Sequence, residues 1–392
     1  MSDNQICSIC SSNQLKKAFT LPSYPAYIVP VPLDISKKVE KAELTLFFCE
    51  NCSHMQTLNP DKELQRLIYE EYYSYYVVDS SESFVPHYRI PFINFIENLR
   101  NNNVFKDKEN ILEIGCSSGN QVSFFKQIAN NYYGIDPSEK IDLGKEKHPD
   151  ENFVKGYFPE DICDVNFDVI VSQFNLEHIL NVTDFIFKIH SSLNEDGIVI
   201  IQVPDVEDFL RNKQPNFMAH EHIQYFTKSS LQKLLESQNF EIIEWGNNGP
   251  SLIVAARKSS NQKIYSFDND IELSFKNIQT HIDLFHSRPK NIPSNVVYYG
   301  VGPLLYWLAS QNNGIDDCIV CDDNPNYNGQ GLPGYGNEIF KPSEDIFIKN
   351  NTIVLSLNKF YHSVVIQKLK KYRIPMEIYL INDEGEWQIT HI

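Results

Sequence analysis

Short apolar runs alternate with amphipathic stretches through the middle of the chain. The runs that predict buried strands lie at residues 110–114, 132–136, 167–172, 197–203 and 251–256. Residues 121–128 and 229–238 have helical spacing. Apolar runs of this length are typical of strands covered on both faces by helices. The pattern therefore predicts a doubly wound α/β sheet between residues 68 and 258.

A second set of apolar runs follows the polar segment 259–266, which we interpret as a linker. The strands that this set predicts lie at residues 295–299, 318–323, 352–356 and 377–381. A tight Gly turn follows the first of them, at Gly300 to Gly302. Residues 259–392 are therefore predicted to form a second, smaller α/β domain.

The first 67 residues have a different character. Two cysteine pairs flank a Pro-rich insert at residues 21–32. Its prolines argue against regular structure and favour a loop wrapped over a neighbouring part of the protein. We therefore expect three domains, at residues 1–67, 68–258 and 259–392.

Composition agrees with several folded domains and excludes some partners. A chain of 392 residues with 42% hydrophobic residues exceeds what one hydrophobic core usually supports. The formal net charge is 34 − 51 = −17, and no basic cluster stands out. Nucleic acid and anionic membranes are therefore not expected as partners. Without a secretory pattern or a long apolar stretch, we expect a cytoplasmic protein without disulfides.

The strand at residues 110–114 leads into a glycine loop that predicts a ligand site. Glu113 ends the apolar run, and Gly115 and Gly119 allow the backbone to approach a ligand closely. The next strand ends at Asp136, where a ribose would need a carboxylate acceptor. Cys116, Ser117 and Ser118 put side chains where a dinucleotide would need bare backbone, so a ligand without a diphosphate fits better.

This loop resembles the S-adenosylmethionine (SAM) loop of class I methyltransferases. The resemblance implies that the methionine part of SAM lies near Gly115 to Gly119 and that its ribose lies on Asp136. It also implies that the adenine lies near Tyr157 and Phe158. A glycine-rich turn without a ligand is the alternative.

Four cysteines have the spacing of a metal site. They form two C-x-x-C pairs, Cys7 with Cys10 and Cys49 with Cys52. Four thiolates make a closed tetrahedral shell, so we expect a structural zinc ion that stabilises the N-terminal domain and takes no part in catalysis. We expect His54 to be a surface residue and not a ligand. The other C-x-x-C pair, Cys318 and Cys321, lies in a predicted strand whose faces alternate, so we interpret it as structural, like Cys116 and Cys163.

The order of the motifs along the whole chain resembles the three-domain sugar C-methyltransferase family, typified by TDP-deoxysugar 3-C-methyltransferases. The segments that carry the resemblance are the cysteine pairs with the Pro-rich insert, the aromatic stretch 72–83, the SAM loop, Asn175-Leu-Glu-His-Ile179, Ala219-His-Glu-His-Ile-Gln-Tyr-Phe226 and residues 322–334. The resemblance implies that Asn175 belongs to the cofactor site. It also implies that a nucleotide-linked keto-sugar lies between the middle and C-terminal domains.

Methylation of carbon requires a base over the C–H bond and a group that stabilises the enolate. The resemblance assigns the base to His222, beside Glu221, and places His178 at the ketone or hydroxyl oxygen. A base works best with a pKa near the working pH, so we expect burial and neighbouring acids to shift the pKa values of both imidazoles. Packing or surface roles are the alternatives for these histidines, and we favour such a role for His220.

This chain departs from the family at Ala219, where a tyrosine is common. Tyr73, Tyr75 or Tyr76 are candidates to replace that phenol, and we select Tyr75 as a catalytic candidate. Gly300, Gly302 and Asp322 are weak candidates for contacts with the nucleotide, as are Arg288, Lys290 and Lys341 for its phosphates. The open alternatives are a SAM-dependent sugar O-methyltransferase and a non-catalytic scaffold that binds sugar nucleotides. The sequence does not predict the sugar, the nucleotide or the oligomeric state.

Overall fold

The computed structural model describes residues 5–72, 85–105, 109–162, 165–211, 217–247, 250–259, 278–280, 295–311, 315, 318–382 and 385–392. The sequence candidates that lie outside these residues are Tyr73, Tyr75, Tyr76, Cys163, Arg288 and Lys290. Within the described residues the protein is an α/β protein with a mostly parallel middle sheet, a C-terminal α/β sheet and an N-terminal sheet next to a cysteine cluster. The predicted fold class is confirmed.

The middle sheet has the strand order β11-β12-β9-β8-β5-β6-β7. Its strands are β5 (Glu109–Ile114), β6 (Ala129–Asp136), β7 (Asn152–Lys155), β8 (Phe167–Gln173), β9 (Leu193–Pro204), β11 (Phe240–Asn247) and β12 (Ser251–Lys258). The pairs from β7 through β9 are parallel, whereas β12 is antiparallel to both β9 and β11. Chain order reverses at β5, between β6 and β8, and ligands of such sheets bind at the carboxyl ends of the strands there.

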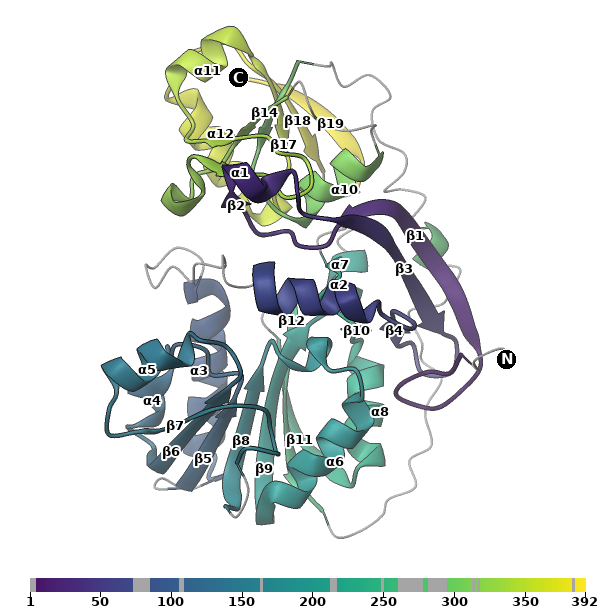
Figure 1. Ribbon diagram of the computed structural model, residues 1–392, viewed down its shortest axis with the longest axis vertical. Coiled ribbons are helices and arrows are strands. Elements are labelled where there is room, and N and C mark those ends of the chain that lie inside the picture. Colours follow the sequence, from purple (N-terminus) through teal and green to yellow (C-terminus); the bar gives the residue numbers. More distant parts are fainter. Residues whose placement is uncertain are drawn as a thin grey trace.

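Helices cover both faces of the middle sheet (Figure 1). They are α3 (Val85–Asn101), α4 (Val122–Phe125), α5 (Ile141–Lys147), α6 (Val182–Ser192) and α8 (Lys228–Ser237). The short helices η3 (Leu176–His178) and α7 (Val206–Arg211) follow the ends of β8 and β9, and α7 packs in the apolar cluster of the N-terminal sheet. Two apolar clusters lie against the sheet, one around Leu112 and Val199 and the other around Ile111 and Ile200. Adjacent residues of β5 and of β9 thus point to opposite faces, as strand geometry requires. Helix α4 is shorter than the helix predicted at residues 121–128.

The C-terminal sheet has the order β16-β14-β13-β17-β18-β19 and is parallel except for β19. Its strands are β13 (Val297–Tyr299), β14 (Ile319–Cys321), β16 (Ile339–Phe340), β17 (Thr352–Leu355), β18 (Glu377–Ile381) and β19 (Trp387–His391). Its helices are α10 (Pro303–Gln311), η4 (Pro325–Tyr327), α11 (Glu344–Lys349), η5 (Lys359–Tyr361) and α12 (His362–Lys370). The strands predicted in this half of the chain are confirmed.

The N-terminal segment forms a sheet of order β1-β3-β4-β10. Its elements, with the short helices and the strand β2 that accompany it, are β1 (Leu15–Pro25), β2 (Val31–Pro32), α1 (Leu33–Ser36), β3 (Lys41–Cys49), β4 (Met55–Gln56), α2 (Lys62–Arg66), η1 (Leu67–Glu71) and β10 (Gln224–Tyr225). Strand β10 comes from the middle of the chain, so the sheet joins two of the expected domains. We keep the boundaries after residues 67 and 258 as a proposal.

The Pro-rich insert divides into two parts. Its first part belongs to strand β1, so the prediction that it lacks regular structure is wrong there: Tyr24 pairs with Ala42 of β3, and Pro25 with Lys41. Its end, β2, pairs with β15 (Gln330–Gly331) of the C-terminal domain, as expected for a segment wrapped over a neighbour. Figure 1 shows β1 and β3 running beside both α/β sheets, with β2 and α1 reaching the C-terminal one.

Tyr24 joins the three parts of the protein. Its ring is fully buried, with the centroid 6.4 Å from that of Tyr306 in α10. Its hydroxyl donates to the backbone oxygen of Met218 at 3.0 Å, and its own backbone oxygen lies 3.2 Å from Nε2 of His220. The contact with Tyr24 confirms a packing role for His220.

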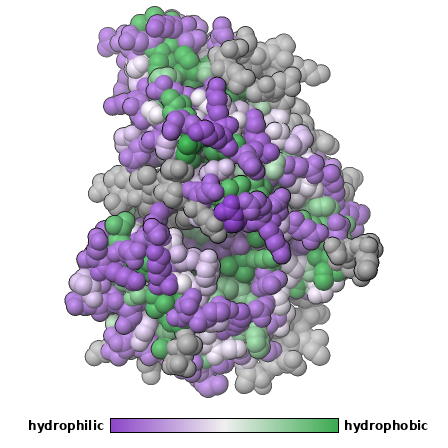
Figure 2. All heavy atoms as spheres, viewed as in Figure 1, coloured by the Kyte–Doolittle hydropathy of each residue, from purple (hydrophilic) through white to green (hydrophobic). Residues whose placement is uncertain are grey.

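The face of the protein that Figure 2 shows is mainly hydrophilic.

Gly331 tests the contact between the N-terminal segment and the C-terminal domain. A Cβ at Gly331 would overlap the side chain of Ser36 and lie 3.0 Å from Cα of Leu33. Because overpacking of this kind is destabilising, Gly331→Ala should lower the free energy of unfolding by about 1–3 kcal/mol in urea titrations. Gly302→Ala is the matched control, since a Cβ there meets nothing within 4 Å. Equal stability of the two variants would contradict the assigned contact.

Candidate functional site

The loop after β5 has the backbone geometry that the sequence predicts. Gly115 and Gly119 have φ values of +78° and +70°, which side chains disfavour. The amide of Gly115 donates to the backbone oxygen of Ile135 at 2.9 Å, so the loop turns tightly over the end of β6. A Cβ at Gly115 would lie 3.4 Å from Cβ of Asn175, which follows β8. The loops after β5, β6 and β8 therefore meet at one edge of the sheet.

Asp136, at the end of β6, organises this edge. Its Oδ2 accepts a hydrogen bond from the amide of Ser117 at 2.8 Å, and its Oδ1 accepts from the amide of Ser138 at 2.8 Å. The carboxylate thereby orients the glycine loop from below. Oδ1 also accepts from the hydroxyl of Ser138, so one lone pair on Oδ2 remains for a ribose hydroxyl. The turn at Gly115 and this carboxylate fit the methionine and nucleoside parts of SAM.

Glu113 lies beneath the glycine loop, and its carboxyl oxygens are hydrogen-bonded to protein side chains. It is buried, Oε2 accepts from the Tyr132 hydroxyl at 2.6 Å, and Oε1 accepts from Nε2 of Gln121 at 2.9 Å. Burial raises the pKa of Glu113 to about 7, although both hydrogen bonds act in the opposite direction. Its predicted contact with the cofactor stays a proposal. Gln121 and Tyr132, which sequence reasoning missed, hold it under the loop.

Tyr157 and Phe158 differ sharply in their surroundings. Phe158 is buried, and its ring packs edge-on against Phe185 with centroids 5.7 Å apart. Tyr157 is 68% exposed, and its amide donates to Oδ2 of Asp161 at 2.8 Å. Of the two residues predicted to lie at the adenine, only Tyr157 has an open ring face available, while Phe158 belongs to the core.

Two hydrogen bonds bring the predicted catalytic histidines together. The amide of Ile223 donates to the backbone oxygen of Glu177 at 2.8 Å, and Nδ1 of His178 lies 3.0 Å from the backbone oxygen of Glu221. Helix η3 is thereby joined to the segment 219–225. As a result, the ring centroids of His178 and His222 lie 5.0 Å apart. Asn175, which contacts the glycine loop, is three residues before His178.

The hydrogen bonds determine which ring nitrogens carry protons. A carbonyl oxygen only accepts, so Nδ1 of His178 must donate to Glu221, and Nε2 of the neutral ring holds a lone pair. The backbone of Phe217 acts to raise the pKa of His222, as a carbonyl oxygen near the imidazole does, but burial outweighs it. The neutral ring of His222 also keeps one lone pair.

Burial dominates the electrostatics of this pair. It lowers the pKa of His178 to about 4, and burial together with His178 lowers the pKa of His222 to about 3. Burial also raises the pKa of Glu177 to about 8 and that of Glu221 to about 7. The pKa values of both imidazoles are thus shifted by burial, but away from neutral pH and without an acidic side chain among the causes, contrary to the expected tuning toward the working pH. Both rings are neutral near pH 7.

A phenol missed by the sequence analysis lies beside His178. The Tyr69 hydroxyl is 3.1 Å from Nδ1 of His178 and 3.4 Å from the backbone oxygen of Glu221. Tyr69 lies in η1, just before the aromatic stretch from which Tyr75 was selected, and its side chain is 42% exposed. Ala219 is buried, and its oxygen accepts from the Tyr225 hydroxyl at 2.9 Å.

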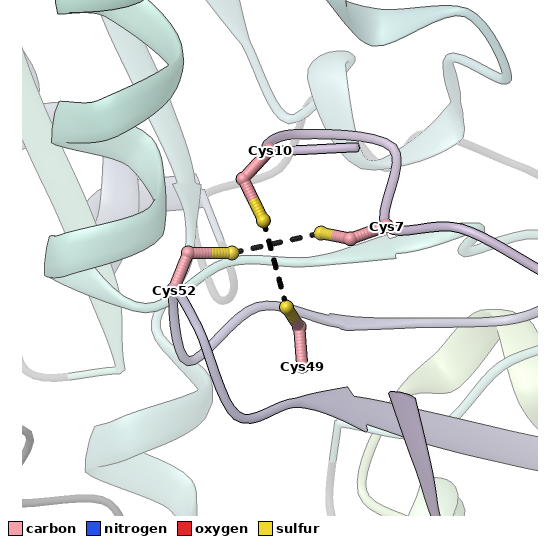
Figure 3. A group of neighbouring side chains, drawn as sticks. All are labelled: Cys7, Cys10, Cys49 and Cys52. Atoms are coloured by element: carbon pink, nitrogen blue, oxygen red, sulfur yellow. Dashed lines mark hydrogen bonds between the residues drawn. The ribbon is translucent and has the colours of Figure 1, made fainter. Parts of the chain in front are cut away.

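The four N-terminal cysteines converge on one point (Figure 3). Sγ of Cys7 lies 3.5 Å from Sγ of Cys52, and Sγ of Cys10 lies 3.6 Å from Sγ of Cys49. Each pair sits on a turn, closed by the amide of Ser11 on Cys7 and that of Ser53 on Cys49. Four sulfurs about 2.3 Å from a tetrahedral metal would be about 3.8 Å apart. The cluster therefore fits a thiophilic divalent ion.

The other thiols and His54 are not part of this cluster. His54 is fully buried, with Nε2 2.8 Å from Oε1 of Gln224 in β10, so the surface prediction for it is wrong. Its imidazole instead attaches the cysteine turns to the middle of the chain. Cys116 and Cys321 are buried, and Cys318 is half-buried.

The C-terminal domain repeats the geometry of the glycine loop. Oδ2 of Asp322, just after β14, accepts from the amide of Val301 at 2.7 Å, and its Oδ1 accepts from the amide of Asn324 at 2.8 Å. Gly300 has a φ of +105°. Contacts of this loop or of Lys341 with a nucleotide stay a proposal.

Residues 87–244 match the protein family described as "Methyltransferase domain". The matched stretch contains β5 to β10, the glycine loop, Asp136 and the His178–His222 pair. With the order of the middle sheet, it defines a class I SAM-dependent methyltransferase domain.

Two curated proteins are similar to parts of the chain. The C-methyltransferase NovU of Streptomyces niveus is 23% identical over 158 residues, which are 38% of this chain and 38% of NovU. The uncharacterised protein MJ1252 of Methanocaldococcus jannaschii is 22% identical over 221 residues, 52% of this chain and 86% of its own. The alignment thus spans well under half of NovU, and the activity of the whole protein is a matter for proposal.

Solved structures of methyltransferases also resemble part of the chain. A putative SAM-dependent methyltransferase from Listeria monocytogenes has 17% identity and a TM-score of 0.37, covering 44% of this chain and 99% of its own. The N-methyltransferase NodS from Bradyrhizobium japonicum has 14% identity and a TM-score of 0.35, covering 45% and 98%.

Among the residues that the structure describes, no helix has the length and apolar character needed to cross a membrane.

The raised pKa of Glu113 predicts a pH dependence of stability. Below about pH 4.5 the carboxyl is protonated in both folded and unfolded chains. Between about pH 4.5 and 7 the unfolded chain releases a proton that the folded chain keeps, so the free energy of unfolding should fall by roughly 3 kcal/mol as the pH rises through this window. Glu113→Gln removes this term. In urea titrations without SAM, the free energy of unfolding of the variant should rise relative to that of wild type as the pH rises. A difference between the two that does not change with pH would refute the assignment.

Proposed function

We propose that this protein is a SAM-dependent C-methyltransferase that acts on a nucleotide-linked keto-sugar, with His222 as the general base. The observation that supports the proposal best is the His178–His222 pair, with ring centroids 5.0 Å apart, on a loop that contacts the glycine loop through Asn175. The likeness to the C-methyltransferase NovU over 158 residues agrees with it. It rests further on the resemblance of the motifs to sugar C-methyltransferases.

In this proposal the glycine loop and Asp136 bind SAM, which supplies an electrophilic methyl group when bound. The methionine part lies over the turn at Gly115, while Gly119 packs against Phe153 and Val122. The remaining lone pair of Asp136 accepts a hydrogen bond from a ribose hydroxyl. The exposed ring of Tyr157 stacks on the adenine. Glu113 acts from beneath, through Gln121, to hold the loop in shape.

His222 then removes the proton from the carbon next to the ketone. The lone pair of its neutral ring takes the proton, and the electrons of the C–H bond form the enolate of the sugar. That carbon forms a bond to the methyl group, and the S–CH₃ electrons remain on sulfur. Half-burial keeps His222 neutral over a wide range of pH, so its ring is ready to accept the proton, while the low pKa of about 3 makes it a weaker base than a free imidazole.

The enolate oxygen needs a hydrogen-bond donor. His178 is not this donor, because its N–H already donates to the backbone oxygen of Glu221 and its other ring nitrogen carries a lone pair. We therefore assign a donor role to the hydroxyl of Tyr69, in the place of the phenol that Ala219 removes. Its O–H donates to the backbone oxygen of Glu221 at 3.4 Å and turns to the enolate oxygen when the sugar binds. Tyr75 stays a further candidate outside the described residues. Glu221 supports the pair through its backbone oxygen, and its carboxyl is a second candidate base.

Replacement of His222 tests the assignment. His222→Asn should lower kcat by about 100-fold or more, because proton transfer loses its acceptor, while the Kd for SAM stays within about twofold. Turnover is measured by mass spectrometry with a panel of keto-sugar nucleotides, and SAM binding by calorimetry. His148→Ala, at the end of α5, is the control histidine and should behave as wild type. Unchanged turnover in His222→Asn would rule out the general-base role.

A sugar O-methyltransferase is the second candidate function, and Ala219 favours it because the site lacks one phenol of the family pattern. In that case a histidine deprotonates a hydroxyl and no enolate forms. Incorporation of solvent deuterium next to the ketone, without methyl transfer, separates the two reactions. A scaffold without turnover would bind sugar nucleotide but yield no methylated product.

We also propose that the four-cysteine cluster holds a structural zinc ion. Contacts with Cys10 and Cys49, together with burial, raise the pKa values of Cys7 and Cys52, so four neighbouring thiolates need a cation. All four sulfurs bind the ion and complete its tetrahedral shell, so it has no open coordination position. His54 and Ser8 connect the cluster to Gln224, next to the catalytic segment.

Loss of one thiol should therefore affect both metal content and folding. Cys49→Ser should retain less than about half of the zinc of wild type by elemental analysis and should unfold at lower temperature. Cys318→Ser, outside the cluster, is the matched control and should keep its zinc. Full zinc content in Cys49→Ser would contradict the proposal.

A further inference from the structure

Glu177, His178 and His222 bring three metal-ligating groups together, apart from the cysteine cluster. One ligand atom from each lies within 4.8 Å of the others. Glu177 and His178 lie in η3, after β8, and His222 lies in the segment that precedes β10. Three zinc ligands at about 2.1 Å would be about 3.4 Å apart in tetrahedral geometry, so the three groups need to close by at most about 1.4 Å.

The carboxyl of Glu177 is the second observation that indicates a ligand. Glu177 is 2% exposed, and its Oε2 is buried without a hydrogen-bond partner. A buried carboxyl oxygen without a partner costs about 1–3 kcal/mol, and a bound ion or water would remove that cost. The backbone of Glu177 is held by the amide of Ile223 at 2.8 Å, which limits how far the side chain can move away.

One of the two imidazoles is already oriented as metal ligands usually are. A histidine that binds a metal typically donates its other ring N–H to a backbone carbonyl or carboxylate. His178 donates its Nδ1 proton to the backbone oxygen of Glu221 at 3.0 Å, so its Nε2 keeps a lone pair. The neutral ring of His222, with its centroid 5.0 Å from that of His178, also has one nitrogen without a proton.

We propose that Glu177, His178 and His222 form a binding site for a divalent transition-metal ion. Two imidazoles and one carboxylate suit Zn²⁺, Co²⁺ or Fe²⁺, and they leave coordination positions open for a ligand oxygen. Mg²⁺ and Ca²⁺, which take oxygen ligands, do not suit the set. The site does not rest on the proposed methyl transfer. A bound ion occupies the lone pair that His222 needs as a base, so ion binding and base catalysis by His222 exclude each other.

Cobalt titration of the full-length protein, with zinc already bound to its cysteines, tests the site without SAM or sugar. We expect one additional Co²⁺ per chain, with visible d–d absorption but without the thiolate-to-cobalt charge-transfer bands that displacement of zinc would produce. Glu177→Gln should weaken the binding by more than about tenfold, and His178→Ala should weaken it further. His148→Ala should bind Co²⁺ as wild type does.

The absence of this additional Co²⁺ in wild type would overturn the proposal, and so would equal binding by wild type, Glu177→Gln and His178→Ala. Near-ultraviolet circular dichroism verifies that each variant is folded. If Glu177→Gln or His178→Ala is not folded, His222→Asn replaces that variant in the titration. Because the titration contains no methyl donor or acceptor, its failure is distinct from a failure of the proposed methyltransferase activity.

Discussion

The candidate site depends on how the segment Ala219–Tyr225 is held. On one side the N-terminal part binds it, through Tyr24 on His220, His54 on Gln224 and the pairing of β10 with β4. On the other side η3 binds it, through the backbone of Glu177 and the ring of His178. This double attachment orders a stretch with only two residues of regular structure. The cysteine cluster, far from the glycine loop in sequence, therefore supports the residues proposed for catalysis.

The backbone carbonyls in this arrangement determine its chemistry. The backbone oxygen of Glu221 accepts the Nδ1 proton of His178, and both neutral imidazoles have a lone pair near the buried Glu177. Lone pairs of this kind serve either a proton or a metal ion. The same geometry thus supports the base proposed for methyl transfer and the proposed transition-metal site, and the two uses compete for His222.

Predictions that rested on local patterns agreed with the structure more often than those that required the surroundings. The apolar runs became strands, because a buried parallel strand needs little beyond its own residues and covering helices. The Pro-rich insert was predicted as irregular, yet its first part pairs with β3, since Pro25 lies at the strand end. His54 was expected at the surface, but its position depends on Gln224, 170 residues away, which no local pattern indicates.

The sequence by itself determined the strands, the glycine loop with Asp136 and the two cysteine turns, because each depends on spacing within a short stretch and on the conformational freedom of glycine. Only the tertiary structure decided that Glu113 lies beneath its loop, that Phe158 belongs to the core while Tyr157 does not, and that Tyr69 lies beside His178. The tautomer of His178 and the convergence of Glu177 with His222 also depend on burial and on backbone carbonyls from distant segments. Those contacts exist only once the chain has folded.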